Sequence, residues 1–285
     1  MLSPYQRSRL LISSGLIVCL IVFWLGATFL RVPLLPRQAG ALLAQPSPAK
    51  ALLVTGVLFL ASVVLGSAIA GTVQFEAGFF CAAFAMAALS MRAGPMRETL
   101  FVASGPGIYL RLALELAFLY LLLGIGWSVL GALVQTGVVR AEAPISPTDD
   151  ADEPIDQRLL GTLAQAVAMS ILIMILCRSD DKAQALVSVG VSALVATLAS
   201  HQFVPARPSV WFWIGPALVG LAGYVGTYFH PSGWNVGDVR GFFAPLARPL
   251  PIDYATFGTA GAILGYWTSR RWQRGRAQAE LQANA

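Results

Sequence analysis

Charged residues are scarce in this 285-residue chain: they make up 12% of it, against 56% for hydrophobic residues. A soluble domain usually carries about 25% charged residues, so the composition argues against a water-soluble globule. The apolar residues gather in runs of roughly 18 to 27 residues, which is the length that a helix needs to cross a hydrocarbon core about 30 Å thick. The chain is therefore expected to be a multi-spanning membrane protein.

Cysteine and histidine are also rare. The three cysteines, Cys19, Cys81 and Cys177, lie in or beside apolar runs, and their odd number and wide spacing suggest neither a disulfide framework nor a zinc site. The two histidines, His201 and His230, follow successive apolar runs, so one membrane crossing should separate them. They could not then share one haem or one metal ion, and we expect no cofactor.

Motifs of soluble and intramembrane catalysis are missing from the sequence. There is no HExxH and no GxxxxGK[ST], and no glycine fingerprint follows a strand. The stretch "NVGD" has Asn235 where an aspartyl protease GxGD motif needs glycine, and "PTDDADEPIDQR" lacks the alternating ligands and central glycine of an EF-hand. These absences make an enzyme the less favoured interpretation.

The net charge of +5 does not indicate nucleic-acid binding, because the basic residues are not spread over a soluble face. Four of the nineteen form a cluster just after the last apolar run: Arg270, Arg271, Arg274 and Arg276. Such a cluster typically holds a helix end near anionic lipid headgroups. The bilayer is thus the first expected partner, and a nucleic acid is not.

Eight apolar segments can be counted. They are 10–30, 51–71, 74–91, 108–135, 159–177, 183–203, 210–229 and 254–269. Only helices or closed barrels satisfy the backbone in hydrocarbon, and continuous apolar runs favour helices. The predicted fold is an all-α polytopic transmembrane bundle of about eight helices. The alternative is seven crossings plus a re-entrant segment, because 254–269 is short and contains three glycines.

The linkers divide the chain into two groups of four segments. Residues 1–139 hold the first group and 159–269 the second, and the basic tail 270–285 follows. Between the groups, 140–158 carries six of the fourteen acidic residues, a composition that predicts a flexible loop. The short link between the second and third segments predicts an antiparallel hairpin, and Pro216 predicts a kink in the seventh.

Membrane orientation stays open at this stage. With eight crossings and the N-terminus inside, nine basic residues lie inside and ten outside, so the positive-inside rule does not decide. Seven crossings with the N-terminus outside would place fourteen inside and five outside. We favour eight because the last segment carries a helix-packing motif. Trp211, Trp213, Trp267 and Trp272 lie at segment ends, where aromatic belts form.

Small residues recur at four-residue spacing in three segments. The sixth has Ser188, Ser192, Ala196 and Ser200, the second has Ser62, Gly66 and Ala70, and the eighth has Gly261 and Gly265. Small residues let membrane helices approach closely. Packing within one compact bundle is the favoured interpretation, and a face for a homo-oligomer or a protein partner is the alternative.

Arg111 and Glu115 are the clearest polar exception inside an apolar run, "YLRLALELAFLY". Residues four apart share a helix face, and ionisable residues in a membrane segment are functional candidates by default. The pair is either an interfacial ion pair that orients the helix or a proton or cation site centred on Glu115. A second partner for Glu115 is expected, either Gln165 or Arg97.

The long connection 230–254 is the second candidate region. It carries Asp238, Arg240, Arg248 and Asp253 among glycines, prolines and aromatics. Long connections are often functional, although this one could simply dip into the headgroup layer. If it were catalytic, Asp238, Arg240 and Asp253 would act on a lipid headgroup.

Three functions are therefore considered. The leading hypothesis is a non-catalytic subunit, scaffold or assembly factor, because polar intramembrane groups are few. The alternative is a transporter or permease for a small solute or proton, lined by Glu115, Arg111 and Gln165. The third is a membrane-embedded enzyme acting on lipid headgroups. The excess of arginine over lysine and the lack of targeting motifs favour a bacterial inner membrane.

Overall fold

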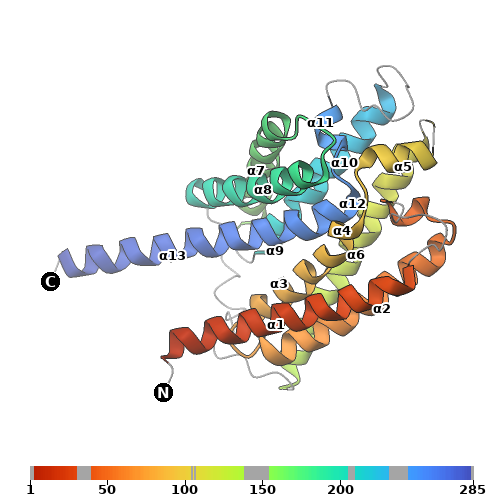
Figure 1. Cartoon of the computed structure of the whole chain (residues 1–285). Coiled ribbons are helices and arrows are strands. Elements are labelled where there is room, and N and C mark those ends of the chain that lie inside the picture. The colour runs from red at the N-terminus through yellow and green to blue at the C-terminus, as the bar shows by residue number, and fades with distance from the viewer. Residues whose placement is uncertain are drawn as a thin grey trace.

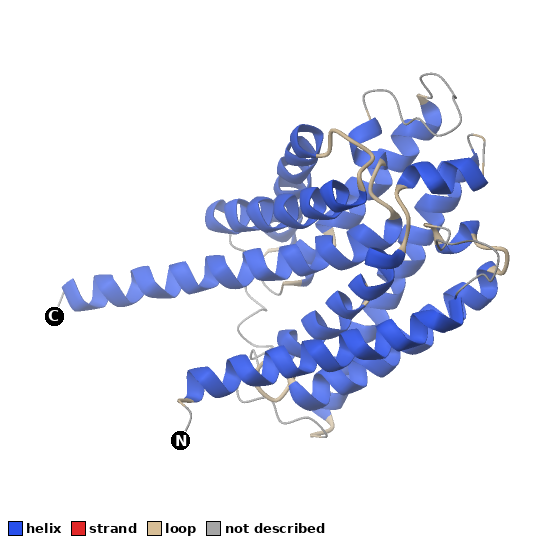
Figure 2. Cartoon of the chain, viewed as in Figure 1, coloured by secondary structure: helices blue, strands red, loops and turns tan. Residues whose placement is uncertain are grey.

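The computed structural model describes residues 3–30, 40–103, 105, 107–137, 154–204, 209–230 and 243–283. Every regular element in these residues is a helix (Figure 2). The elements are α1 (Pro4–Gly26), η1 (Ala27–Leu30), η2 (Leu42–Ala44), α2 (Pro48–Ile69), α3 (Phe75–Ala85), α4 (Ala87–Arg92), α5 (Met96–Val102), α6 (Gly107–Gln135), α7 (Ile155–Leu176), α8 (Lys182–Phe203), α9 (Val210–Trp213), α10 (Gly215–Phe229), α11 (Ala244–Ala247), α12 (Pro251–Asp253), η4 (Tyr254–Gly258) and α13 (Thr259–Ala283). The predicted all-α fold is confirmed.

Seven stretches of helix are long and apolar enough to cross a membrane. They are Gln6–Leu30, Pro48–Ile69, Phe75–Arg92, Gly107–Gln135, Ile155–Leu176, Lys182–Phe203 and Val210–Phe229. They coincide with the first seven predicted segments, so the chain is a multi-pass membrane protein. The eighth segment lies within η4 and α13, which continue α12 as one helix that does not turn back.

The outer surface of the bundle is apolar. On α8, Val187, Val191 and Val195 are exposed at four-residue spacing, whereas the adjacent Ser188 and Ser192, on a different face, are buried. In a water-soluble protein a helix turns its apolar stripe inward. Here the apolar stripe faces outward, as it must when hydrocarbon is the solvent.

The third membrane segment and the last helix form the centre of the bundle. In the third segment, 78% of the most apolar stretch is buried, against 28% in α1, α6 and α7. Almost every residue from Pro251 to Ile263 is buried as well. The third segment and residues 251–263 touch little of the surrounding solvent, so they can carry the polar groups described below.

Glycines set the closest helix approaches. A Cβ on Gly66 of α2 would lie 2.7 Å from the carbonyl oxygen of Gly78 in α3. A Cβ on Gly261 would overlap the carbonyl oxygen of Gly190, and one on Gly265 would overlap that of Leu194. The predicted small-residue motifs are thus used for packing within the chain, and α8 and α13 run parallel to each other.

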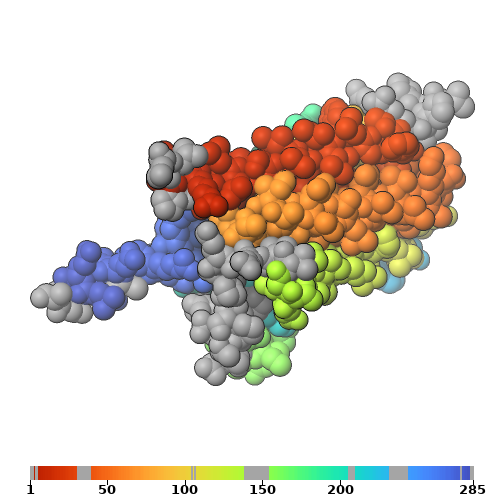
Figure 3. All heavy atoms as spheres, turned by 90° about the horizontal axis from the view of Figure 1, so that it is seen from below, coloured from red at the N-terminus to blue at the C-terminus, as the bar shows by residue number. Residues whose placement is uncertain are grey.

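Both termini lie at the same end of the bundle (Figure 1). We call this the terminal end, and we call the opposite end, where α5, α11 and α12 lie, the distal end. The end of α13 projects from the bundle at the terminal end, as the space-filling view shows (Figure 3). Two termini lie at the same end when the chain passes through the bundle an even number of times.

Two local expectations have different outcomes. The helix is interrupted at Ile214, between α9 and α10, next to Pro216 as predicted. The aromatic-belt expectation is wrong for Trp213, which is buried. Trp267 is half-buried, and its indole makes the hydrogen bond described below. Both rings pack against phenylalanines of α3, because the central position of α3 brings it within reach of both helices.

Candidate functional site

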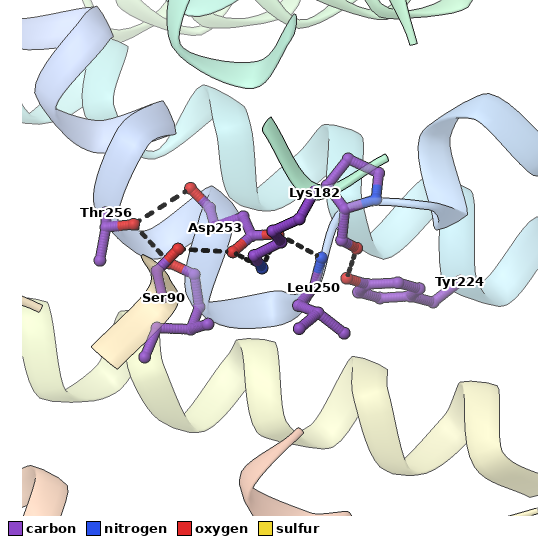
Figure 4. Close-up of polar contacts among 8 residues, drawn as sticks. Ser90, Lys182, Tyr224, Leu250, Asp253 and Thr256 are labelled. Carbon is purple, nitrogen blue, oxygen red and sulfur yellow. Dashed lines mark hydrogen bonds and ion pairs between the residues drawn. The ribbon is translucent and has the colours of Figure 1, made fainter. Parts of the chain in front are cut away.

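The polar contacts at the distal end centre on Asp253, whose side chain is fully buried. Its Oδ1 accepts hydrogen bonds from Ser90 Oγ at 2.7 Å and from Lys182 Nζ at 2.6 Å. Its Oδ2 accepts from Lys182 Nζ at 2.8 Å and from the Leu250 amide at 2.8 Å (Figure 4). The carboxylate therefore joins α4, the first residue of α8 and the start of α12. We call Ser90, Lys182, Leu250 and Asp253 the Asp253 cluster.

The backbone just before Asp253 is held by two buried tyrosines. Tyr224 Oη donates to the Pro249 carbonyl at 2.5 Å, and Tyr254 Oη donates to the Leu246 carbonyl at 2.7 Å. Arg248 lies beside them, pairs with Asp180 at 3.1 Å and donates to the Cys177 carbonyl at 2.7 Å. These contacts fix the end of the 230–254 connection against α7 and α10.

Glu115 is fully buried in α6, but its partner is not the expected one. Its Oε2 accepts the Leu43 amide at 2.9 Å, at the start of the short helix η2. Carboxylates are favourable at helix N-termini, where backbone N–H groups lack partners. Glu115 thus anchors residues 40–45 to the bundle.

The predicted pairing of Arg111 with Glu115 is wrong. Arg111 is exposed and makes no described ion pair, whereas Glu115 points into the bundle. Four residues turn a helix by about 400°, which leaves the two side chains roughly 40° apart around the axis. That offset, together with the length of the arginine side chain, lets Arg111 extend outward while Glu115 stays inside.

Gln165 is fully buried in α7 and bonds to a different helix from the expected one. Its Nε2 donates to Thr197 Oγ1 of α8 at 2.7 Å. Its Oε1 packs against Gly215, where any Cβ would overlap it. Gln165 is therefore a packing contact among α7, α8 and α10, and the described structure does not join it to Glu115.

The three loop candidates have separate outcomes. Asp238 and Arg240 lie outside the described residues. Asp253 is described, and it belongs to the Asp253 cluster, where its oxygens already accept four hydrogen bonds. A functional role for any of them remains a prediction.

A third buried carboxylate lies at the terminal end. Glu76, at the start of α3, accepts the Trp267 indole N–H at 2.6 Å and the Gln74 amide at 3.2 Å, both on Oε2. We call Gln74, Glu76 and Trp267 the Glu76 cluster. Nearby, His201 Nδ1 lies 2.7 Å from Ser269 Oγ, so this histidine is buried between α8 and α13 and does not sit at an exposed interface.

The two clusters define one register. Glu76 meets Trp267 and Ser90 meets Asp253, so fourteen residues separate the two contacts on each helix. At about 1.5 Å per residue, both separations are about 21 Å. The third membrane segment and the last helix therefore run antiparallel and are joined near both ends. Phe84 and Phe257 pack between the two contacts.

Sequence reasoning missed Lys182, Ser90 and the role of Glu76. Lys182 carried one signal, since it is one of only two lysines and directly follows Asp180 and Asp181 at the start of an apolar run. A serine such as Ser90 in an apolar helix carries no comparable signal. Nothing local relates Lys182 to Asp253, which lies 71 residues away.

The arrangement joins helices that are distant in sequence. Ion pairs and charged hydrogen bonds are strong in a low-dielectric interior, and each buried carboxylate here connects different elements. Among the described residues, no group of three or more histidine, cysteine, aspartate or glutamate side chains could hold a metal ion.

Comparisons with known proteins found no match: no protein-family model, no curated protein and no solved structure is similar to this chain at a significant level.

Proposed function

We propose that this protein is a non-catalytic membrane subunit or scaffold that binds a protein partner through the end of its last helix. The observation that carries the proposal is the C-terminal extension, residues 274–283 of α13. Gln273 makes the last described contact with the bundle, through the His201 carbonyl at 3.3 Å. Beyond it, each described residue up to Gln282 is exposed.

The last helix is longer than a membrane crossing requires. From Pro251 to Ala283 the helix is continuous, and at about 1.5 Å per residue it is about 50 Å long. A hydrocarbon core is about 30 Å thick, so about 20 Å of helix remains. An isolated helix of this length has marginal stability in water. Docking on a partner would stabilise the extension.

The chemistry of the extension indicates the kind of partner. It presents Arg274 and Arg276 in its first turn and Leu281 near its end, and Leu281 is 72% exposed. Trp272, at its base, is 51% exposed. A partner that offers carboxylates beside an apolar patch would complement both features.

The buried carboxylates provide a second, independent argument for the same proposal. Asp253, Glu115 and Glu76 each accept hydrogen bonds from elements that are distant in sequence. Their hydrogen bonds hold the bundle together, as expected of a rigid platform.

Site-specific photocrosslinking tests the proposal. A photoreactive amino acid at Leu281 should cross-link to a second polypeptide in native membranes, whereas the same probe at the lipid-facing Ile171 should label mainly lipid. Truncation after Gln273 should abolish co-purification of that polypeptide and leave the melting temperature in detergent within a few degrees of the full-length value. A full-length protein that is a clean monomer in mild detergent, with no cross-link at Leu281, would overturn the proposal.

A proton or cation carrier is the second candidate, favoured by Glu115 alone. This carboxyl group is fully buried in a membrane segment, and no hydrogen bond to its Oε1 is described. Such groups mark proton and ion pathways in many membrane proteins. Glu115→Gln should then abolish proton or cation flux into proteoliposomes, and Arg111→Gln should not. Absence of flux in the unaltered protein would remove this candidate.

A further inference from the structure

A charged pocket opens at the distal end, between the start of α5 and the turn that precedes α8. Its volume is about 460 Å³, within the range of small-ligand pockets. It is lined by Pro95 and Arg97 on one side and by Ser179, Asp180, Asp181 and Lys182 on the other. Lys182 thus belongs both to the pocket and to the Asp253 cluster.

Two of the four charged side chains in the pocket are already paired within the protein. The Lys182 ammonium is bound by Asp253, and Asp180 is bound by Arg248. The remaining two are Arg97 and Asp181, both exposed. Asp181 caps α8 through Oδ1, which accepts the Gln184 amide at 3.0 Å, and no described contact uses its Oδ2. The pocket therefore presents one cation and one anion to a ligand.

The neighbouring surface is suited to acyl chains. Arg97 and Phe101 lie four residues apart on α5, so they share a face of that helix. Phe101 is 76% exposed and the adjacent Val102 is 53% exposed. A ligand whose charged part binds Arg97 can therefore lay an apolar part along Phe101.

We propose that this pocket binds the headgroup of an aminophospholipid of the phosphatidylethanolamine class. The Arg97 guanidinium would pair with the phosphate diester, for which its planar donors are well suited. The Asp181 carboxylate would accept hydrogen bonds from the primary ammonium. A headgroup with an additional carboxylate would place a second negative charge near Asp181 and should bind less well.

Native mass spectrometry of the full-length protein tests the proposal with lipids of identical acyl chains. Phosphatidylethanolamine should be retained in preference to phosphatidylglycerol and phosphatidylcholine. Arg97→Ala should lower its retention about tenfold, the effect expected from losing one charge-assisted contact. The matched control is Arg111→Ala, which removes an exposed arginine at the same end but outside the pocket.

Asp181→Asn tests the ammonium contact separately from folding. Asparagine caps helices as well as aspartate does, so α8 should stay intact while the negative charge is lost. The preference for phosphatidylethanolamine over phosphatidylglycerol should then disappear. Equal losses from Arg97→Ala and Arg111→Ala, or no headgroup preference in the unaltered protein, would overturn the proposal. Retention of free phosphoethanolamine without retention of the lipid would overturn the lipid assignment.

Discussion

The two ends of the central helix pair bury a carboxylate in different ways. At the distal end Asp253 faces a lysine ammonium, a hydroxyl and a backbone amide. At the terminal end Glu76 Oε2 accepts hydrogen bonds from the neutral Trp267 indole and the neutral Gln74 amide, while the Arg270 guanidinium acts on this carboxyl group only through space. The contacts lie in the same register on the same two helices, so the difference lies in the chemistry of the donors and not in the position along the helix pair.

This difference separates two kinds of dependence. A buried ion pair depends on both charges, because removing one leaves the other without compensation. A carboxylate held by neutral donors depends mainly on having an acceptor oxygen in the right place. The distal end should therefore be sensitive to loss of charge, and the terminal end to loss of the hydrogen bond.

The largest test asks whether the two helices cross the membrane side by side. The register of the clusters implies that the last helix crosses beside the third segment, giving eight crossings. Reporter domains fused before Met1 and after Ala285 should then report the same side of the membrane. If the two reporters lay on opposite sides of the membrane, the last helix could not cross the membrane antiparallel to the third segment. The comparison between the two ends of this helix pair would then have no basis.

Loss of the distal charge should have the largest energetic effect. Asp253→Asn keeps the size of the side chain but leaves the Lys182 ammonium unpaired, and it should lower the free energy of unfolding by about 3 kcal/mol. SDS titration in mixed micelles measures this. The double variant with Lys182→Met should recover part of the loss, and Arg111→Met serves as the exposed control. A change below about 0.5 kcal/mol in Asp253→Asn would contradict the assignment.

Packing between the ends is tested at Gly261. Gly261→Ala places a methyl group against the Gly190 backbone, which cannot yield as a side chain would, and it should cost about 1–3 kcal/mol. Gly275→Ala is the matched control on the same helix, because nothing lies within 4 Å of its Cβ position. It should be neutral or slightly stabilising, since alanine favours helices. Equal effects at both positions would rule out the close approach of α8 and α13.

The smallest changes in the free energy of unfolding are expected at the terminal end, where two substitutions should have different effects. Trp267→Phe removes a hydrogen-bond donor from buried Glu76 and should cost about 1–2 kcal/mol. Glu76→Gln keeps an acceptor oxygen for the indole and should cost less than about 1 kcal/mol. Both are measured by the same SDS titration. A larger loss in Glu76→Gln than in Trp267→Phe would show that this end also depends on charge.

Much of the fold could be predicted because it depends on residues that are close together in the sequence. Apolar runs of spanning length predicted the seven membrane stretches, and the small-residue motif at Gly261 and Gly265 predicted a close helix contact. Prediction from neighbouring residues failed where a side chain could contact more than one part of the structure. Glu115 and Arg111 lie one turn apart, yet only Glu115 points inward, and it bonds to a backbone amide 72 residues away.

The sequence by itself determined that this chain is a membrane protein and where its helices run. The reason is that backbone hydrogen bonds inside a helix are local, and hydrocarbon offers the backbone N–H and C=O groups no other partners. Only the tertiary structure decided which charges are matched. Asp253 meets Lys182 and Ser90, and Glu76 meets Trp267, because the order in which helices pack sets the neighbours of each buried group. Helices of similar hydropathy can be arranged in many orders, so composition and spacing alone do not specify these pairs.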